Sequence, residues 1–449
     1  MYDAVSIEDR KKPVVTLTNI GFANDAESAS RGKGIPVMRI VPTRVPCEAS
    51  IMEDIEAGVD GALDAIIAAL TRPLTAEEKS PRPMEAEKPA RIIFKGSLEE
   101  VNRFFYQRGW TDGLPIIPPT EEAVAEMLTG TDFPADHLLG KLQSRMGKAT
   151  VEKIAINAVM AGALPTYLPV LIAGTIDLLE SEPGFMGYTT FGFSTGSWAP
   201  FWVINGPIRN QINVNNSSGA FSPGNIANAA IGRAMGLIIK NIGGVRKGIE
   251  DMGVMGNPMK YCMVIGENEE DSPWEPLHVE HGYKKEDSTI SLAFPQSYLQ
   301  HWPYGADAQG ILRSVVDNIP RSMRYTLVFT PTHAKNLARE GFTKEKVKKF
   351  IAENKVVPMS RVMAAGLGGP RPPGAPPGPV PGKDEMVPLI RDYCYIRVIV
   401  GGGPGAFIAH IVGGGATPGK KEIQKIDLPK NWAKLVAKYK NVVPTYAKY

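Results

Sequence analysis

The segment Val203–Gly244, VINGPIRNQINVNNSSGAFSPGNIANAAIGRAMGLIIKNIGG, joins a polar loop rich in asparagine and glycine to a stretch of apolar residues at helical spacing. Ser222 is a suitable N-cap, and Pro223 suits the first helical turn because its missing N–H costs nothing there. Gly243 and Gly244 fit a C-terminal stop. The segment therefore predicts a helix that begins at Ser222 and ends before Gly243.

The start of this expected helix is a candidate anion site. A helix N-terminus presents unpaired N–H groups and a positive dipole end, which suit a small carboxylate or phosphate. Amide and guanidinium side chains gather around it, and the candidate substrate-binding residues are Asn205, Arg209, Asn215, Asn225, Asn228 and Arg233. The alternative is that the asparagines only satisfy the backbone of turns, as asparagine commonly does. The sequence leaves both interpretations open.

Composition narrows the class of protein. The chain has 449 residues, of which 43% are hydrophobic and 22% charged, as in a globular protein with sizeable cores. A net charge of +3, with no basic stripe interleaved with aromatic residues, argues against a nucleic-acid partner. No apolar run is long enough to cross a bilayer, and the first residues do not form a signal peptide, so we expect a cytoplasmic protein without membrane partners. Three widely separated cysteines exclude a disulfide framework and a zinc ribbon.

Breaks in composition predict an α/β protein, with a small N-terminal half-domain followed by a larger mixed α/β domain. The expected divisions are 1–74 for the small domain, 75–89 for a linker, 90–360 for the main domain, 361–383 for a proline- and glycine-rich insert, and 384–449 for a C-terminal strand and turn that complete the main domain. We find no internal repeat in the sequence.

Local patterns predict the elements. Expected strands are 14–17, 37–41, 92–94, 261–266, 325–329 and 394–400. Expected helices are 23–30, 50–70, 98–108, 121–128, 151–161, 168–179 and 344–354, in addition to the one after Ser222. Pro118 and Pro119 predict that TDGLPIIPPT (Thr111–Thr120) is a fixed, extended loop.

The last expected strand runs into the glycine-rich segment GGGPGAF (Gly401–Phe407). Its spacing does not give G-x-G-x-x-G, and Pro404 interrupts the turn, so a tight turn is favoured over a dinucleotide site. A ligand could nevertheless approach this bare backbone closely.

The segment ENEEDSPWEPLHVEHG (Glu267–Gly282) follows a strand and is dense in titratable groups. Glu267, Glu269 and His278 are the candidate acid–base residues, with Trp274 able to raise a carboxyl pKa by lowering the local polarity. His278 and His281 could share a metal on a helix, but Pro273 and Pro276 favour irregular backbone and no H-E-x-x-H pattern occurs. We therefore predict no metal ligands, and the sequence indicates no particular cofactor.

Several strings in this chain resemble the UGSC family of selenoproteins and their cysteine homologues. The N-terminal run YDAVSIEDRKKPVVTLTNIGFANDAESASRGKGIPVMRIV (Tyr2–Val41) looks like the part of that family's domain that follows its redox motif. Further runs resemble domains found beside it: TDGLPIIPPTEEAV, ATVEKIAINAVMAGALPTYLPV, VINGPIRNQINVN, SPGNIANAAIGRA, GENEEDSPWEPLHVEHG and VIVGGGPGAF. The family is related to the selenoprotein subunit of glycine, sarcosine and betaine reductases. The resemblance implies thiol or selenol chemistry on small amino-acid-like substrates, with a low-pKa chalcogenolate as nucleophile.

One departure from the family concerns the nucleophile. Its cysteine- or selenocysteine-Gly-Ser-Cys motif would lie just before Tyr2, where this chain has only Met1. We expect either that the redox pair has been lost or that the start lies downstream of an in-frame selenocysteine codon. Cys47 is the only cysteine in the small domain and is interpreted as a buried apolar residue.

Two classes of function remain. The first is an oxidoreductase-like enzyme that acts on a small anionic substrate by thiol- or selenol-linked reduction, with the nucleophile supplied from elsewhere. The second is a non-redox lyase or hydrolase that uses Glu267, Glu269 and His278, with or without a metal. An assembly subunit is a third reading. A homo-oligomer, or a complex with a redox partner subunit, is expected because the small domain would leave an open sheet edge.

Overall fold

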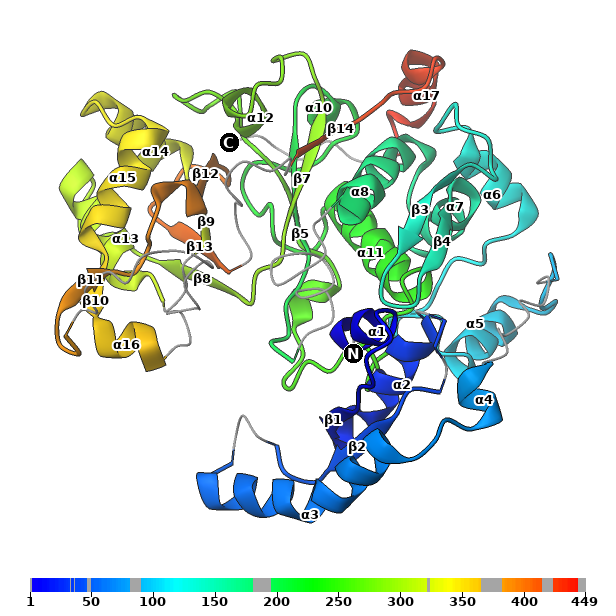
Figure 1. Cartoon of the computed structure of the whole chain (residues 1–449). Coiled ribbons are helices and arrows are strands. Elements are labelled where there is room, and N and C mark those ends of the chain that lie inside the picture. Colours follow the sequence, from blue (N-terminus) through cyan, green and yellow to red (C-terminus); the bar gives the residue numbers. More distant parts are fainter. Residues whose placement is uncertain are drawn as a thin grey trace.

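The structure is a computed structural model that describes residues 2–32, 34–35, 37–46, 50–80, 90–180, 195–320, 324–364, 382–413 and 423–442. A small N-terminal unit of helices and two strands lies beside a larger body that holds two four-stranded mixed sheets (Figure 1). The predicted α/β class is therefore confirmed. No helix in these ranges is both long and apolar enough to span a bilayer.

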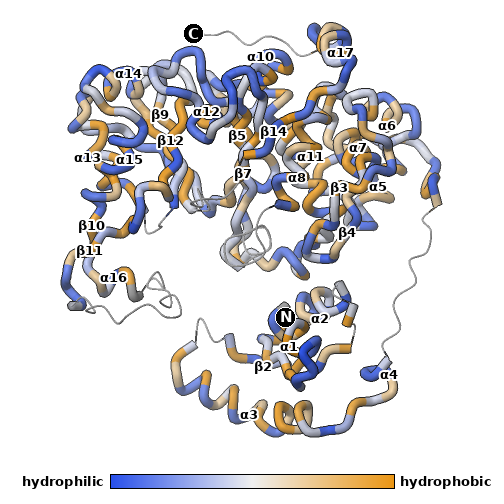
Figure 2. The backbone as a smooth tube through the Cα atoms, turned by 45° about the horizontal axis from the view of Figure 1, so that its top comes forward, coloured by the Kyte–Doolittle hydropathy of each residue, from blue (hydrophilic) through white to orange (hydrophobic). Residues whose placement is uncertain are grey.

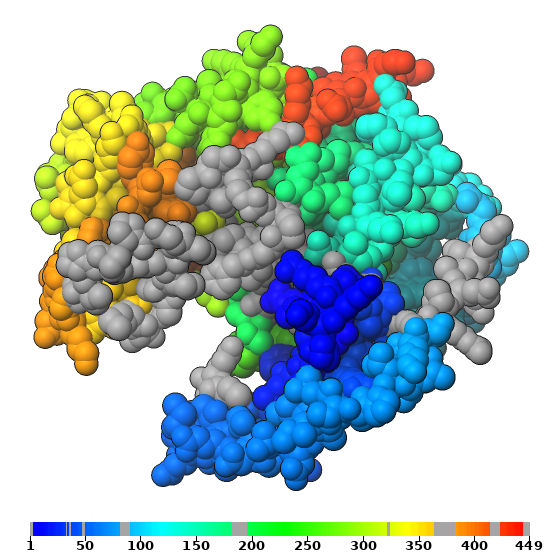
Figure 3. Space-filling view, in the orientation of Figure 1, coloured from blue at the N-terminus to red at the C-terminus, as the bar shows by residue number. Residues whose placement is uncertain are grey.

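The N-terminal unit forms a lobe of its own (Figure 3). Its strands β1 (Thr16–Asn19) and β2 (Ile40–Thr43) pair in parallel, and no third strand joins them in the described part of the chain. Its helices are α1 (Tyr2–Glu8), α2 (Ala23–Gly32), α3 (Met52–Thr71) and α4 (Ala76–Lys79), with a 3-10 turn at Ile20–Phe22. The strands begin two to three residues later than the sequence predicted.

The long helix α3 is poorly covered. Ala62 is its only buried residue, whereas Val59, Leu63 and Ile67, which follow each other at helical spacing, are 39%, 47% and 49% exposed. Figure 2 shows apolar segments along this helix at the outer side of the lobe. An apolar stripe on a solvent-facing helix is typical of a surface that another element covers.

The expected linker begins later than predicted. Thr75 and Glu78 form a reciprocal capping box on α4, and the Glu78 carboxylate also pairs with Arg39 and Arg72 of the N-terminal unit. Residues 75–80 therefore belong to that unit, because local capping and ion pairing outweigh the charged, proline-bearing composition. The remainder of the expected linker, 81–89, is outside the described residues.

The small unit contacts the body through α2. Ser28 Oγ donates to Glu250 Oε1 at 2.5 Å, and Arg246 donates to both Glu250 and Ser28. Burial and the neighbouring Glu250 carboxylate raise the pKa of Asp25 to about 6. This contact places two carboxyl groups and one guanidinium where the two parts meet.

Each sheet of the body has the same internal arrangement. The first has the order β14-β7-β5-β6, with β5 (Phe201–Asn205), β6 (Val264–Gly266), β7 (Thr289–Ala293) and β14 (Ile423–Lys425). The second has the order β8-β13-β9-β12, with β8 (Ser297–His301), β9 (Tyr325–Phe329), β12 (Ile396–Val400) and β13 (Ile408–Val412). In both, two antiparallel pairings are followed by one parallel pairing.

The two sheets face each other, and helices cover their outer sides (Figure 1). Val203 and Ile265 of the first sheet share one buried cluster with Val328 and Ile399 of the second. The first sheet is covered by α7 (Val151–Met160), α8 (Leu168–Glu180) and α11 (Ile226–Asn241), and the second by α13 (Ala308–Asn318), α14 (Pro331–Arg339) and α15 (Lys344–Asn354). The body is thus a four-layer sandwich of helices, sheet, sheet and helices.

The body contains a duplication that the sequence does not reveal. Apart from α12 (Leu277–Glu280) in the first run and β10 (Val356–Pro358), α16 (Met359–Ala364) and β11 (Met386–Pro388) in the second, the order helix, strand, helix, helix, strand, strand, strand occurs twice. It runs through α8, β5, α10 (Ile208–Gln211), α11, β6, β7 and β8, and again through α13, β9, α14, α15, β12, β13 and β14. The last strand of each run lies in the sheet of the other. Glu267 N donates to Ile204 O at 3.1 Å, and Gly401 N donates to Phe329 O at 3.0 Å. These bonds fix Glu267 and Gly401 as equivalent positions, and Asn205 and Thr330 likewise.

Most of the other predicted elements are confirmed. The ranges of α6 (Glu121–Leu128), β9 and α15 agree with the prediction, and α5 (Leu98–Gln107), α7 and α8 differ by one residue. Strand β6 is shorter than predicted, and a 3-10 turn at Tyr393–Tyr395 replaces the start of β12. The loop Thr111–Thr120 is extended as expected and is held by Asn102, which bonds the Ile116 backbone.

Two predicted elements are wrong. Residues Ile92–Phe94 form no strand; they lie exposed ahead of α5, and the Phe94 ring stacks on Phe104 at 4.6 Å. The helix expected from Ser222 begins at Ile226, because the Asn225 side chain bonds the carbonyls of the preceding turn. Only Met359–Ala364 (α16) and residues 382–383 of the region around the proline-rich insert are described.

Smaller elements complete the body. They are β3 (Leu138–Leu142) paired with β4 (Gly147–Thr150), β10 (Val356–Pro358) paired with β11 (Met386–Pro388), α12 (Leu277–Glu280), α17 (Trp432–Tyr439) and 3-10 turns at Pro165–Tyr167 and Pro258–Lys260. Helix α17 and β14 bring the C-terminal region back to the first sheet.

Candidate functional site

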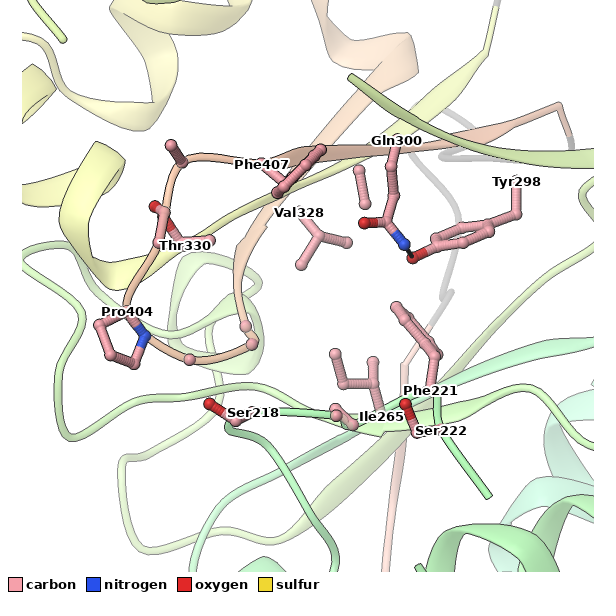
Figure 4. A pocket seen from close by; sticks show the side chains of 18 residues that line it. Ser218, Phe221, Ser222, Ile265, Tyr298, Gln300, Val328, Thr330, Pro404 and Phe407 are labelled. Atoms are coloured by element: carbon pink, nitrogen blue, oxygen red, sulfur yellow. Dashed lines mark hydrogen bonds between the residues drawn. The ribbon is translucent and has the colours of Figure 1, made fainter. Parts of the chain in front are cut away.

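A cleft opens between the two sheets at the ends of β9 and β12. The loop Ser218–Ser222, which precedes α11, forms one side, and the glycine-rich segment Gly401–Phe407 forms the other (Figure 4). The cleft has a volume of about 450 Å³. Ligands of open α/β sheets commonly bind at the carboxyl ends of strands, so this is the candidate binding site.

The floor and the rim of the cleft differ in character. Ala220, Ile265, Val328 and Gly401 are buried and apolar at its base. Polar groups of Ser218, Ser222, Thr330, Tyr298 and Gln300 lie around them, the last two joined by a hydrogen bond across strand β8 (Figure 4). No charged residue among the described ones lines the cleft.

Glycines allow the two loops to approach. A Cβ at Gly403 would collide with Ser218 Oγ, and Gly402 has a φ of +79°, in the left-handed region that favours glycine. Gly401 N and Gly402 N donate to Phe329 O and Asn216 O, whereas the N–H groups of Gly403, Gly405 and Ala406 have no acceptor among the described residues. The turn favoured by the sequence analysis is therefore also a wall of the cleft with free backbone donors.

The asparagines predicted to bind an anion brace the loop instead. Asn225 is buried and donates to the carbonyls of Gly219 and Ser222, and its own oxygen accepts from Asn215. Asn228 bonds both backbone groups of Asn215 and donates to Val264 O. These contacts agree with the alternative in which asparagine satisfies turn backbones, and they shape the cleft wall without lining it.

The predicted acid–base residues meet in a buried network near the end of β6. Glu267 is fully buried, and its carboxylate accepts from Asn205 Nδ2 at 2.6 Å and Leu277 N at 2.7 Å. Lys344 Nζ lies 3.3 Å from the other Glu267 oxygen. Glu269 accepts from Asn205 and Gly206 N, and its carboxylate lies 4.0 Å from His278 Nδ1.

Arg209 closes this network. Its guanidinium donates to the Glu267 backbone carbonyl at 2.5 Å and pairs with Glu269 and Glu270. Burial opposes ionisation of Glu270, but the hydrogen bonds and charge of Arg209 hold the pKa of that carboxyl at about 2. Lys344 and Lys348 likewise lower the pKa of Glu280 against the effect of burial. The ring of Trp274 faces away toward Phe329 and Phe342.

The nine side chains selected from the sequence fall into groups that make structural contacts. Asn205, Arg209, Glu267, Glu269 and His278 lie together, Asn215, Asn225 and Asn228 form a second group, and Arg233 pairs separately with Asp112 at 2.8 Å. None of these nine residues lines the cleft, so their direct roles remain predictions. Thr330, Tyr298 and Phe407 line the cleft but were not among the candidate site residues, although Phe407 ends the glycine-rich segment noted in the sequence. Only the glycine run beside Phe407 gave a signal for them.

The described cysteines lie away from the cleft lining. Partial burial raises the pKa of Cys262, and burial together with Asp392 raises that of Cys394 to about 11. Both thiols are therefore poor thiolates at neutral pH. Cys47 is outside the described residues. In the described ranges no three or more His, Cys, Asp or Glu side chains are arranged to hold a metal ion.

Comparison with protein-family models, with curated proteins and with solved structures gives no match for this chain. The site must therefore be interpreted from its own geometry.

Proposed function

We propose that this chain is the substrate-binding part of an enzyme that acts on a small carboxylate-bearing molecule. The observation that carries the proposal is the cleft of about 450 Å³ between Ser218–Ser222 and Gly401–Phe407. The free N–H groups of Gly403, Gly405 and Ala406 offer donors to a carboxylate, and Thr330 caps the start of α14 at the same place. Backbone donors and a helix start can hold an anion without a lysine or arginine.

Reductive chemistry linked to a thiol or selenol remains the proposed reaction class, on the resemblance to UGSC proteins. The raised pKa values of Cys262 and Cys394 favour a nucleophile supplied by another residue or by a partner subunit. The lyase or hydrolase alternative receives less support, because Glu267 and His278 are buried, Glu269 is partly buried, and none of the three lines the cleft.

The test is to fill the cleft. Ala409 lies on the inner face of β13, so Ala409→Phe places a ring over the floor, and Ala409→Ser is the matched control. We expect calorimetric binding of phenylacetate to be lost in the first variant and kept in the second. Equal binding to both variants, at unchanged melting temperature, would place carboxylate binding elsewhere.

We also propose that the chain self-associates or binds a redox subunit through α3, on the evidence of its exposed Val59, Leu63 and Ile67. Leu63→Glu puts a charge in this stripe, while Asp64→Glu leaves it unchanged. Light scattering on a sizing column should show a smaller mass for the first variant alone; a wild-type monomer that binds no thiol protein would refute this part.

A further inference from the structure

We infer that the substrate carries an uncharged, apolar and preferably aromatic tail, which lies on the floor of the cleft while its carboxylate faces the glycine-rich loop. The inference rests on the proposed function and narrows it to aryl- or alkyl-carboxylates. It differs from the amino-acid-like substrates that the family resemblance implies.

The floor supports an apolar tail directly. Ile265 and Val328 are 1% and 5% exposed, and they come from the two different sheets, so the base of the cleft is where the inner faces of the sandwich meet. An apolar group placed there would remove further apolar surface from water. A polar group placed there would lose its hydrogen bonds to water, and the apolar side chains of the floor offer none in return.

Aromatic rings stand around the opening in two edge-to-face pairs. Phe221 and Tyr298 have ring centroids 5.4 Å apart at 65°, and Trp302 and Phe407 have centroids 5.1 Å apart at 75°. Figure 4 shows Phe221, Tyr298 and Phe407 bordering the same space. Trp302 and Phe407 are 64% and 48% exposed. Large exposed rings grouped at the opening of a cleft are typical of a surface that a flat ligand covers.

The charges nearby are already paired. Glu267 pairs with Lys344, and Glu269 and Glu270 pair with Arg209; none of these residues lines the cleft. An ammonium group on the substrate would therefore lose hydration without gaining a carboxylate from the described lining residues. This distinguishes a simple carboxylic acid from the corresponding amino acid.

Three ligands of one shape test the inference on the whole chain: 3-phenylpropionate, its amide, and phenylalanine, which adds only an ammonium group. Calorimetry should give an affinity for 3-phenylpropionate about tenfold or more above that for phenylalanine. Equal affinities of these two acids would overturn the inference and leave carboxylate binding intact. If the amide binds as tightly as the acid while phenylalanine binds weakly, the apolar tail is supported and the carboxylate part of the proposed function fails. Binding of none of the three overturns both.

A charge added to the lining gives the reciprocal test. Gln300→Glu puts a carboxylate beside Tyr298, and we expect it to raise the affinity for phenylalanine several-fold and to lower that for 3-phenylpropionate. Gln107→Glu makes the same change at an exposed position on α5 and is the matched control. The inference fails if both variants shift the two affinities equally, or if neither shifts them.

Discussion

The body has two halves, each made of one four-stranded sheet and the helices that cover it. The two sheets have equivalent strands, yet the loops after β6 in the first half are packed, whereas those after β12 in the second half border an open cleft. In the first half, the segment between β6 and β7 is long and includes α12, and its Leu277 and Tyr283 join the cluster between the sheets. In the second half, the segment between β12 and β13 is the short glycine-rich Gly401–Phe407, and a cleft lies beside it.

The difference shows how a duplicated scaffold can divide its tasks. Glu267 of the first half corresponds to Gly401 of the second, and Asn205 corresponds to Thr330. The Glu267 carboxylate and its partners therefore fill the space after β6, while Gly401, which has no side chain, leaves space after β12. On the proposed function the cleft binds the ligand, and the buried network of Glu267, Asn205 and Lys344, which we call the structural plug, stabilises the other end.

Among the substitutions considered, removing the Lys344 ammonium group from the structural plug should have the largest effect on stability. Lys344→Ala leaves the fully buried Glu267 carboxylate without its charge partner, so we expect a loss of about 3–5 kcal/mol in the free energy of unfolding. Lys349→Ala on the same helix breaks an exposed pair with Glu345 and should cost about 0.5 kcal/mol or less. Denaturant titration measures both. Similar losses for the two variants would mean that the Glu267–Lys344 pair does not stabilise the fold more than an exposed ion pair does.

Acid should protonate His410 and Glu270 in different pH ranges, while burial also lowers the pKa of His281 in the first half and of His301 and His333 in the second. In the second half, burial and then the neighbouring His301 lower the pKa of His410 to about 3, so folding favours the neutral ring. The contribution of neutral His410 to the free energy of unfolding is fully present above pH 6.5, the ordinary pKa of histidine. It is lost as the pH falls toward 3, by about 2–4 kcal/mol. In the first half, Glu270 has its pKa lowered from 4.5 to about 2, so its contribution is lost only as the pH falls from 4.5 through 2.

Hydrogen exchange followed by mass spectrometry separates these ranges. Between pH 6.5 and 5, peptides from β8 and β13 should lose protection before those from β5 and β6. His410→Gln, which cannot titrate, should reduce this difference, and the part that remains is assigned to His301 and His333, whose pKa values burial also lowers. Simultaneous loss in both halves of the wild type would contradict the assignment of separate acid-sensitive groups.

Local signals made much of this fold predictable. Thr120 and Thr343 cap α6 and α15 through their side chains, and both helices begin where the sequence placed them. The start of α11 was not predictable in this way, because Asn225 bonds the turn before it rather than the helix after it. A capping residue can be recognised from its type, but its actual acceptor depends on the folded loop.

The site was less predictable, since its contacts are long-range. Glu267 and Lys344 are 77 residues apart, so nothing in the sequence signalled that this candidate acid–base group has a buried charge partner. The duplication was hidden for a related reason: equivalent positions hold different residue types, as where a charged glutamate (Glu267) corresponds to a glycine (Gly401). The glycine run was the one local signal of the cleft, and its meaning depended on the loop that faces it.

Exchanging the equivalent residues Asn205 and Thr330 should cause a smaller loss of stability and tests whether the two halves are equivalent at this position. Asn205→Thr gives the first half the hydroxyl that Thr330 provides in the second, and removes the amide bonded to Glu267 and Glu269. We expect a loss of about 1–3 kcal/mol, because two buried carboxylates each lose a donor. Thr330→Asn should cost less, since the Thr330 hydroxyl bonds Gly405 O, His333 N and His333 Nδ1 and serves no buried carboxylate. Thermal unfolding measures the order of the two losses, and the reverse order would show that the halves are not equivalent at this position.

The smallest effect on stability is expected for the change that most affects the cleft. Gly403→Ala puts a methyl group against Ser218 Oγ, 2.9 Å from Ser218 Cβ and 3.1 Å from its backbone Cα, so the side chain must turn and the loop backbone must shift as well. Because Ser218 is exposed, we expect the free energy of unfolding to fall by only about 1 kcal/mol. The same movement widens or displaces the wall that carries the free N–H groups, and the affinity for 3-phenylpropionate should fall about tenfold. Gly282→Ala, at a left-handed turn of the long loop in the first half with nothing within 4 Å of the added Cβ, is the control: it strains the backbone without a clash and should leave ligand affinity unchanged. If Gly282→Ala weakened binding as much as Gly403→Ala, the open end and the packed end could not be assigned the separate tasks inferred here.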